Sequence, residues 1–275
     1  MEITWQVFAI TMGLTLFAGL ATGAGGIVVF FTNKEKISGR FLSASLGFSA
    51  GVMIYISLVE MLAHAREGLS GRFGDVSGGL LTLLVFAAGI GMAFIIDRMV
   101  PEVENPHHVR SGSEMAHAEH ATEEERQRLG RAGMMFALVI AIHNFPEGLA
   151  TLAGGLADSK IGFAIAIAIA LHNIPEGMAV AVPILYATGS RKKAFLYATL
   201  SGLAEPLGAL VGMLILGPVL SEPLLASLFA LVAGIMIYIS FDELLPMAET
   251  YGKHHIALGG LLAGMLFIGV GLELL

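Results

Sequence analysis

The residues best suited to chemistry in this sequence form two copies of one motif, His-Asn-x-Pro-Glu-Gly, at 143–148 and 172–177. Residues four apart lie on one face of a helix, so each copy pairs an imidazole with a carboxylate: His143 with Glu147, and His172 with Glu176. Such a pair can chelate a divalent metal ion. Because both copies lie within apolar runs, the sequence predicts a buried metal centre shared by two helices.

The proline and glycine of the motif indicate how such a centre is enclosed. Pro146 and Pro175 have no N–H, so each leaves a backbone carbonyl one turn upstream, on Ile142 or Leu171, without its helical partner. In hydrocarbon such a carbonyl must be satisfied by something buried, and a polar cavity around an ion can do this. The glycine after each glutamate allows the backbone of a neighbouring helix to approach closely.

Further candidate ligands lie beside the motif and in two other apolar runs. Glu205 precedes Pro206, which repeats the adjacency of proline and glutamate in reverse order. Three carboxylates in low dielectric repel one another, and a metal ion or a proton offsets that repulsion, so we expect metal occupancy to depend on pH. Asn144 and Asn173 can coordinate the ion or brace its ligands. Met53 either adds a thioether or is a packing residue.

Composition indicates that the elements carrying these residues cross a membrane. Only 13% of residues are charged and 56% are hydrophobic, with a mean hydropathy of +0.80, whereas ordinary domains carry about 25% charged residues. We predict an all-α, single-domain membrane protein over 1–275 with eight transmembrane helices. The expected spans are 4–32, 40–64, 77–100, 130–156, 160–188, 192–218, 223–247 and 254–275. The sequence has no cysteine, which excludes thiolate ligands, and its net charge of −7 gives no support to nucleic-acid binding.

Basic residues predict the orientation of these spans. Twelve of the fifteen Lys and Arg residues fall in the loops after spans one, three, five and seven. By the positive-inside rule these loops are cytoplasmic and both termini lie outside, as expected for a protein of the bacterial inner membrane. The longest of these loops, 101–129 between helices 3 and 4, is rich in His and Glu. It is either a metal buffer or sensor, or a solvated linker with incidental histidines.

Two internal repeats indicate a transporter. Residues 51–62 match 234–245 at a constant offset of 183, and the two motif copies are offset by 29. In the predicted topology the two spans of each pair run in opposite directions, so the repeats are inverted and the arrangement is 3+2+3. Inverted repeats around interrupted helices at mid-membrane are typical of transporters that open alternately to the two sides.

At the paired motif the sequence resembles the ZIP family of zinc/iron-type metal transporters, most closely its bacterial ZupT-like branch. The resemblance implies uptake of divalent metal into the cytoplasm through a binuclear centre, with homodimers in some members. It implies that spans one, four, five and six move against a scaffold formed by the others. By position, His143, Glu147 and Glu176 resemble the ligands of one ion, and Asn144, Glu147, Asn173, Glu176 and Glu205 those of the second, while Met53 matches a methionine of span two.

One departure from the family pattern affects the second ion. Some members carry a glutamine and an aspartate where this chain has His172 and Asn173. An additional imidazole and one carboxylate fewer are expected to shift metal preference and to weaken the second site.

These observations predict a transporter of Zn²⁺, and also of Fe²⁺, Mn²⁺ or Co²⁺, because imidazole and carboxylate ligands select weakly among these ions. The transported ion is the only expected ligand, with no prosthetic group. A passive channel using the same residues is an alternative, and so is a receptor that binds metal without transporting it. An intramembrane zinc protease would need a His-Glu-x-x-His helix, and that motif does not occur in the sequence.

Overall fold

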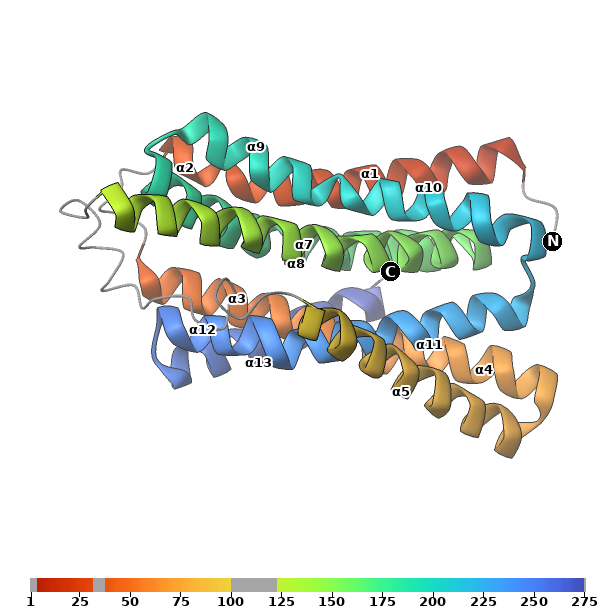
Figure 1. Ribbon diagram of the computed structural model, residues 1–275. Helices are drawn as coiled ribbons and strands as arrows, with labels where there is room; N and C mark the ends of the chain where they lie inside the picture. The colour runs from red at the N-terminus through yellow and green to blue at the C-terminus, as the bar shows by residue number, and fades with distance from the viewer. Residues whose placement is uncertain (1–3, 32–37, 100–122, 275) are drawn as a thin grey trace.

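The computed structural model describes residues 4–31, 38–99 and 123–274, and every regular element within these ranges is a helix (Figure 1). In chain order the described α-helices are α1 (Trp5–Gly26), α2 (Val28–Phe31), α3 (Gly39–Tyr55), α4 (Leu62–Phe73), α5 (Asp75–Met99), α7 (Glu123–Ala157), α8 (Ser159–Thr188), α9 (Arg191–Gly202), α10 (Ala204–Leu216), α11 (Glu222–Ile239), α12 (Leu245–Tyr251) and α13 (His254–Leu274). A short 3-10 turn, Gly217–Val219, follows α10.

Several of these helices are long and apolar enough to cross a membrane, as predicted. Within the described residues there are seven such stretches: Trp5–Phe31, Gly39–Phe73, Asp75–Met99, Ser159–Thr188, Arg191–Val219, Glu222–Tyr251 and His254–Leu274. Beside them runs α7, which is 35 residues long. It begins at Glu123, earlier than the predicted span at 130, because the Glu-rich and Arg-rich stretch before that span favours helix and places acidic residues in the first turn. Most of the predicted loop, 101–122, lies outside the described residues.

The helices form two bundles, which Figure 1 shows one above the other. The first bundle consists of α1, α2 and α7 to α10, with α1 and α7 both packed along α8, and α10 along α7. The second consists of α3 to α5 and α11 to α13, with α3 packed along α13 and α11 along α5. The two bundles meet chiefly where α3 lies against α8 and where α11 lies against α7. The motif helices α7 and α8 therefore line the boundary between the bundles.

Glycines bring backbones close together inside each bundle. The α-carbon of Gly177 faces the carbonyl of Thr22 in α1, and that of Gly148 faces the carbonyl of Glu205 in α10, so a Cβ at either position would collide with backbone. The close approach predicted for the two motif glycines is thus present. For every glycine whose surroundings are described, the nearest atoms belong to the glycine's own bundle. Each bundle is tightly packed internally, and none of these close glycine contacts crosses the boundary between the bundles.

The longer sequence repeat is also a structural repeat. A π-helical turn interrupts the second span at Ile56–Met61, and another interrupts the seventh at Ser240–Leu244, which is the equivalent place after the offset of 183. In Figure 1 the segment α3–α4 and the segment α11–α12 run in opposite directions, as do α7 and α8. Single-turn π-helices are rare and occur frequently at functional sites. Here they place Glu60 and Glu243 at equivalent positions of the two copies.

The packing of Gly177 gives a stability prediction. Gly177→Ala should lower the melting temperature of the purified protein in detergent, because overpacking a tight contact costs about 1–3 kcal/mol. Gly13→Ala is the matched control: Gly13 is in α1, where a Cβ would meet nothing within 4 Å. The control should melt at the wild-type temperature or higher, since Ala favours helix over Gly. Equal effects of the two substitutions would contradict the packing described.

Candidate metal centre

The antiparallel pairing of α7 and α8 brings the two motif copies together. His143 Nε2 lies 3.0 Å from Glu147 Oε1 on the same helix and 3.6 Å from Glu176 Oε1 on the other. One ligand atom from each of these three residues lies within 4.8 Å of the other two. All three side chains are at most 3% exposed. The three residues are therefore close enough together to hold one metal ion.

The second histidine joins this cluster through Glu147. His172 Nε2 lies 2.9 Å from Glu147 Oε1, so one carboxylate oxygen contacts an imidazole from each helix. His172 is fully buried. The structure thus places four of the eight predicted site residues in one group, His143, Glu147, His172 and Glu176.

The two asparagines are braced by hydrogen bonds inside the first bundle. Asn144 Nδ2 donates to the backbone carbonyl of Ser201 at 3.0 Å. Asn173 Nδ2 donates to the carbonyl of Ala18 at 2.9 Å and to Glu205 Oε1. With both amide nitrogens used as donors, each Oδ1 is left as an acceptor without a hydrogen-bond partner within the described residues. Each asparagine therefore has an oxygen that can coordinate a cation.

Several buried polar atoms around this group have no hydrogen-bond partner among the described residues. Glu205 is fully buried and interacts electrostatically with both Glu147 and Glu176. Among the described residues, no hydrogen-bond partner exists for several buried atoms here: Glu147 Oε2, both carboxylate oxygens of Glu176, Glu205 Oε2, and Nδ1 of His143 and of His172. A buried acceptor or anion without a partner is costly. A divalent cation coordinated by the carboxylate oxygens among these atoms would offset that cost.

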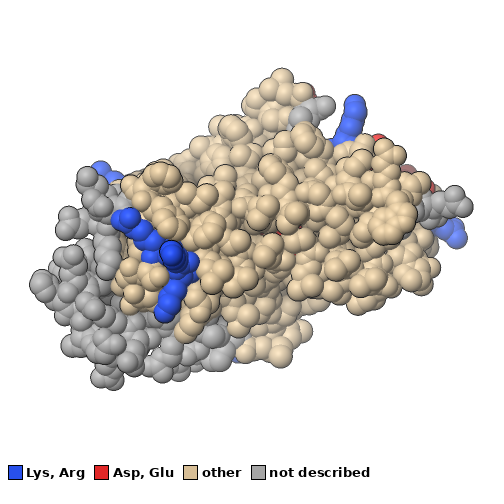
Figure 2. All heavy atoms as spheres, turned by 90° about the horizontal axis from the view of Figure 1, so that it is seen from above, with Lys and Arg blue, Asp and Glu red and all other residues tan. Residues whose placement is uncertain are grey.

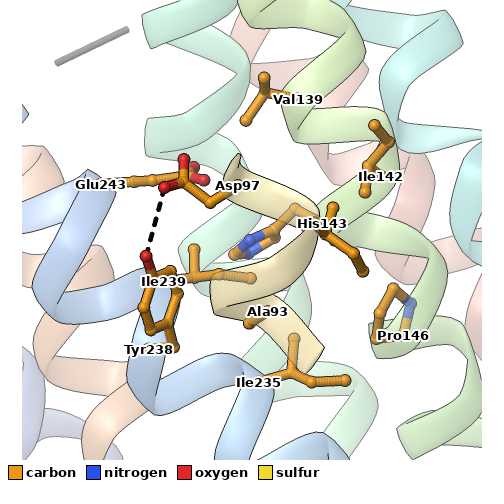
Figure 3. A pocket seen from close by; sticks show the side chains of 11 residues that line it. Ala93, Asp97, Val139, Ile142, His143, Pro146, Ile235, Tyr238, Ile239 and Glu243 are labelled. Atoms are coloured by element: carbon orange, nitrogen blue, oxygen red, sulfur yellow. Dashed lines mark hydrogen bonds between the residues drawn. The ribbon is translucent and has the colours of Figure 1, made fainter. Parts of the chain in front are cut away.

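A small cavity reaches the centre from one side (Figure 3). It has a volume of about 40 Å³ and lies between α5, α7 and α11, with His143 in its wall. Asp97 from α5 and Glu243 from the second π-helical turn lie across from His143, and Tyr238 donates a hydrogen bond of 3.3 Å to Asp97. Asp97 is not among the site residues predicted from the sequence. The sequence does contain a feature that could have identified Asp97, because it is an isolated acid at the end of an apolar run.

Two further residues are not among the four clustered ligands. Met53 is fully buried in α3, and its thioether role stays a prediction. On the other side of the centre, Glu60 Oε1 lies 3.1 Å from His64 Nε2. Glu60 also lines a second cavity of about 320 Å³, together with Lys160 of α8 and Leu272 of α13. None of the four clustered ligands lines this second cavity.

The fold and the site define a class: a helical membrane protein with a His, Glu and Asn centre buried between antiparallel helices. Comparison with known proteins identifies the family. The family model described as ZIP Zinc transporter matches residues 97–274. The chain is 51% identical to the zinc transporter ZupT of Akkermansia muciniphila, over 98% of this chain and 99% of that protein. It is 50% identical to zinc transporter ZupT of Clostridium perfringens (95% and 94% covered) and 51% identical to that of Streptococcus mutans (95% and 96% covered).

The chain therefore belongs to the ZIP family, and the resemblance seen in the paired motif is confirmed. Members of this family are transporters, so the prediction that the chain is not an enzyme is confirmed as well. Together with the apolar helices, membership establishes an integral membrane protein.

Charge neutralisation at the centre gives a binding prediction. Glu147→Gln keeps the shape of the side chain but removes a negative charge from the atoms nearest both histidines. Its zinc affinity, measured by calorimetry on the purified protein, should fall by a factor of at least about 10, because even residues behind metal ligands affect affinity by about 10–100-fold. Glu67→Gln removes a charge from an exposed position of α4 and should bind zinc as the wild type does. Unchanged affinity in Glu147→Gln would exclude Glu147 as a ligand.

Proposed function

We propose that this chain imports Zn²⁺ into the cytoplasm across the bacterial inner membrane, binding the ion at the centre between α7 and α8. The observation that carries the proposal is the set of buried carboxylate and amide oxygens that lack hydrogen-bond partners. Such a set is costly unless a cation occupies it. The three relatives are named as zinc transporters, which agrees with this chemistry.

The proposed ligands follow from the geometry of the centre. His143, Glu147 and Glu176 hold one ion, with His172 as a further ligand through its contact with Glu147. Glu205, Asn144 and Asn173 offer oxygens for a neighbouring ion, with Glu147 and Glu176 shared between the two, and Met53 completes the first site. Mixed nitrogen and oxygen ligands discriminate weakly, so Fe²⁺, Mn²⁺ and Co²⁺ are proposed as further substrates.

The proposed topology has eight spans in a 3+2+3 arrangement, in which α7 is the eighth membrane helix. From residue 134 to its end at Ala157, α7 contains one charged residue, Glu147. On the face seen in Figure 2, the Lys and Arg side chains lie towards the two ends of the long axis and the surface between them carries none, which suits a bilayer. The distribution of Lys and Arg supports the proposed orientation, with both termini outside and the loops 1–2, 3–4, 5–6 and 7–8 in the cytoplasm.

The proposed mechanism is alternating access by sliding of the first bundle against the second. The cavity beside Asp97 and Glu243 reaches His143 from the side where α5 ends, which in the proposed topology is the cytoplasmic side. The cavity beside Glu60 does not include the centre. This combination corresponds to an inward-facing state. Glycine contacts that tighten each bundle, with none of the described ones crossing the boundary, suit two bodies that move as units.

Zinc uptake into proteoliposomes tests the proposal. Wild-type protein should give saturable uptake, and His143→Ala and Glu176→Ala should abolish it, because each removes one of three clustered ligands. Ser57→Ala is the control and should transport normally. Ser57 is buried in the π-helical turn that follows α3, and its hydroxyl has no hydrogen-bond partner among the described residues.

A carrier and a channel are distinguished by adding unlabelled zinc inside the vesicles. In a carrier, internal zinc accelerates entrance of labelled zinc by exchange, whereas in a passive channel it does not. Normal uptake by folded His143→Ala protein would overturn the assignment of the site.

A further inference from the structure

One buried hydroxyl connects the two bundles beside the metal centre. Ser49 lies in α3 of the second bundle and is fully buried. Its Oγ donates a hydrogen bond of 3.1 Å to the backbone carbonyl of His172, in α8 of the first bundle. The same side chain lies next to the carboxylate of Glu176. Ser49 therefore contacts α8 at the turn that carries two of the clustered residues.

The direction of this hydrogen bond is unusual for this protein. A Ser or Thr inside a helix commonly donates to the carbonyl four residues earlier in its own helix. Among the described residues, six side chains do so: Thr82, Thr188, Thr199, Ser227, Ser240 and Thr250. Ser49 instead donates to the main chain of another helix, across the boundary that is proposed to slide.

Such a bond exists at one register of the two helices only. One helical turn rises 5.4 Å, whereas a hydrogen bond needs its heavy atoms within about 3.2 Å. A slide of half a turn therefore separates Ser49 Oγ from the His172 carbonyl. An interaction made in one of two states shifts the equilibrium between them by its full free energy.

We propose that Ser49 is a positioning residue that holds α8 at the inward-facing register and must release the His172 carbonyl when the first bundle slides. The proposal rests on the proposed alternating access. The net free energy of one hydrogen bond corresponds to about a fivefold change in an equilibrium constant. Ser49→Ala should thus shift the protein about fivefold from the inward-facing state toward the outward-facing state, while the ligands of the ion remain intact.

The matched control is in the π-helical turn that follows α3. Ser57 is also fully buried, and its hydroxyl has no hydrogen-bond partner in the described part of the chain. Ser57→Ala removes the same atom without removing a hydrogen bond. It therefore reports any effect of replacing a buried serine as such.

The sequence contains no cysteine, so single cysteines can report each state without background labelling. Val139→Cys lines the inner cavity, one turn before His143. Ala168→Cys lies one turn before His172 and is fully buried in this conformation, so it is reached only when the opposite path opens. The rate of labelling by a water-soluble maleimide is measured for each cysteine in purified, detergent-solubilised protein. The ratio of the two rates follows the ratio of the two states.

Ser49→Ala should lower the ratio of the Val139→Cys rate to the Ala168→Cys rate about fivefold, whereas Ser57→Ala should leave it unchanged. An unchanged ratio in Ser49→Ala would overturn the role of Ser49 but leave zinc transport standing. If Ala168→Cys is never labelled in any background, the sliding mechanism fails and the role of Ser49 fails with it.

If Ser49→Ala does not fold, the pair Ser49→Thr and Ser49→Val replaces it. These two side chains have similar shapes and differ in the hydroxyl, so Ser49→Thr should keep a higher ratio of inner to outer labelling than Ser49→Val. Equal ratios in the two variants would overturn the proposal.

Discussion

The main constraint on this structure is the free-energy cost of burying three carboxylates inside a membrane protein. Glu147, Glu176 and Glu205 are each at most 1% exposed. Among the described residues, the ion pairs of Glu147 and Glu176 are with histidines rather than with Lys or Arg. Anions in this environment need compensation, and imidazoles supply little of it when they are neutral. A polar centre of this kind is stable when it holds a cation, so the rest of the fold must keep the acids together and still leave their oxygens available.

The packing of the first bundle meets that requirement with small residues. Gly148 lets the backbone of α10 approach α7, which carries Glu205 toward the centre, and Gly177 lets α1 approach α8 in the same way. The carbonyl of Ala18 in α1 then accepts from Asn173, which in turn donates to Glu205. The motif therefore contains both the ligands and the glycines that admit the helices bracing them. This explains why the whole motif is repeated, beyond its histidine and glutamate.

The sequence was sufficient to predict what a single helix determines. The spacing of His143 and Glu147, the apolar spans and the close approach at the motif glycines all follow from periodicity and residue type. Contacts between helices that are far apart in the sequence were harder to predict. Asp97 lies near His143 because α5 packs on α11 and α11 meets α7, and the bond from Ser49 to His172 depends on the register of α3 against α8. Periodicity identifies the buried face of a helix, but it does not identify the helix opposite or its register.

The bundle that supplies the hydrogen bonds to the two asparagines affects how the centre can release its ion. Asn144 and Asn173 are held by Ser201, Ala18 and Glu205, and all of these belong to the same bundle as the clustered ligands. If that bundle slides, its His, Glu and Asn ligands and their braces travel together and keep their mutual geometry, whereas Met53 stays with α3 in the second bundle. What changes is the opposing wall, which α3, α5 and α11 of the other bundle contribute. Exposure of the ion to one side or the other can then change without dismantling the site. An ion held by several nitrogen and oxygen ligands can therefore be carried between two exposures and exchange with water at each.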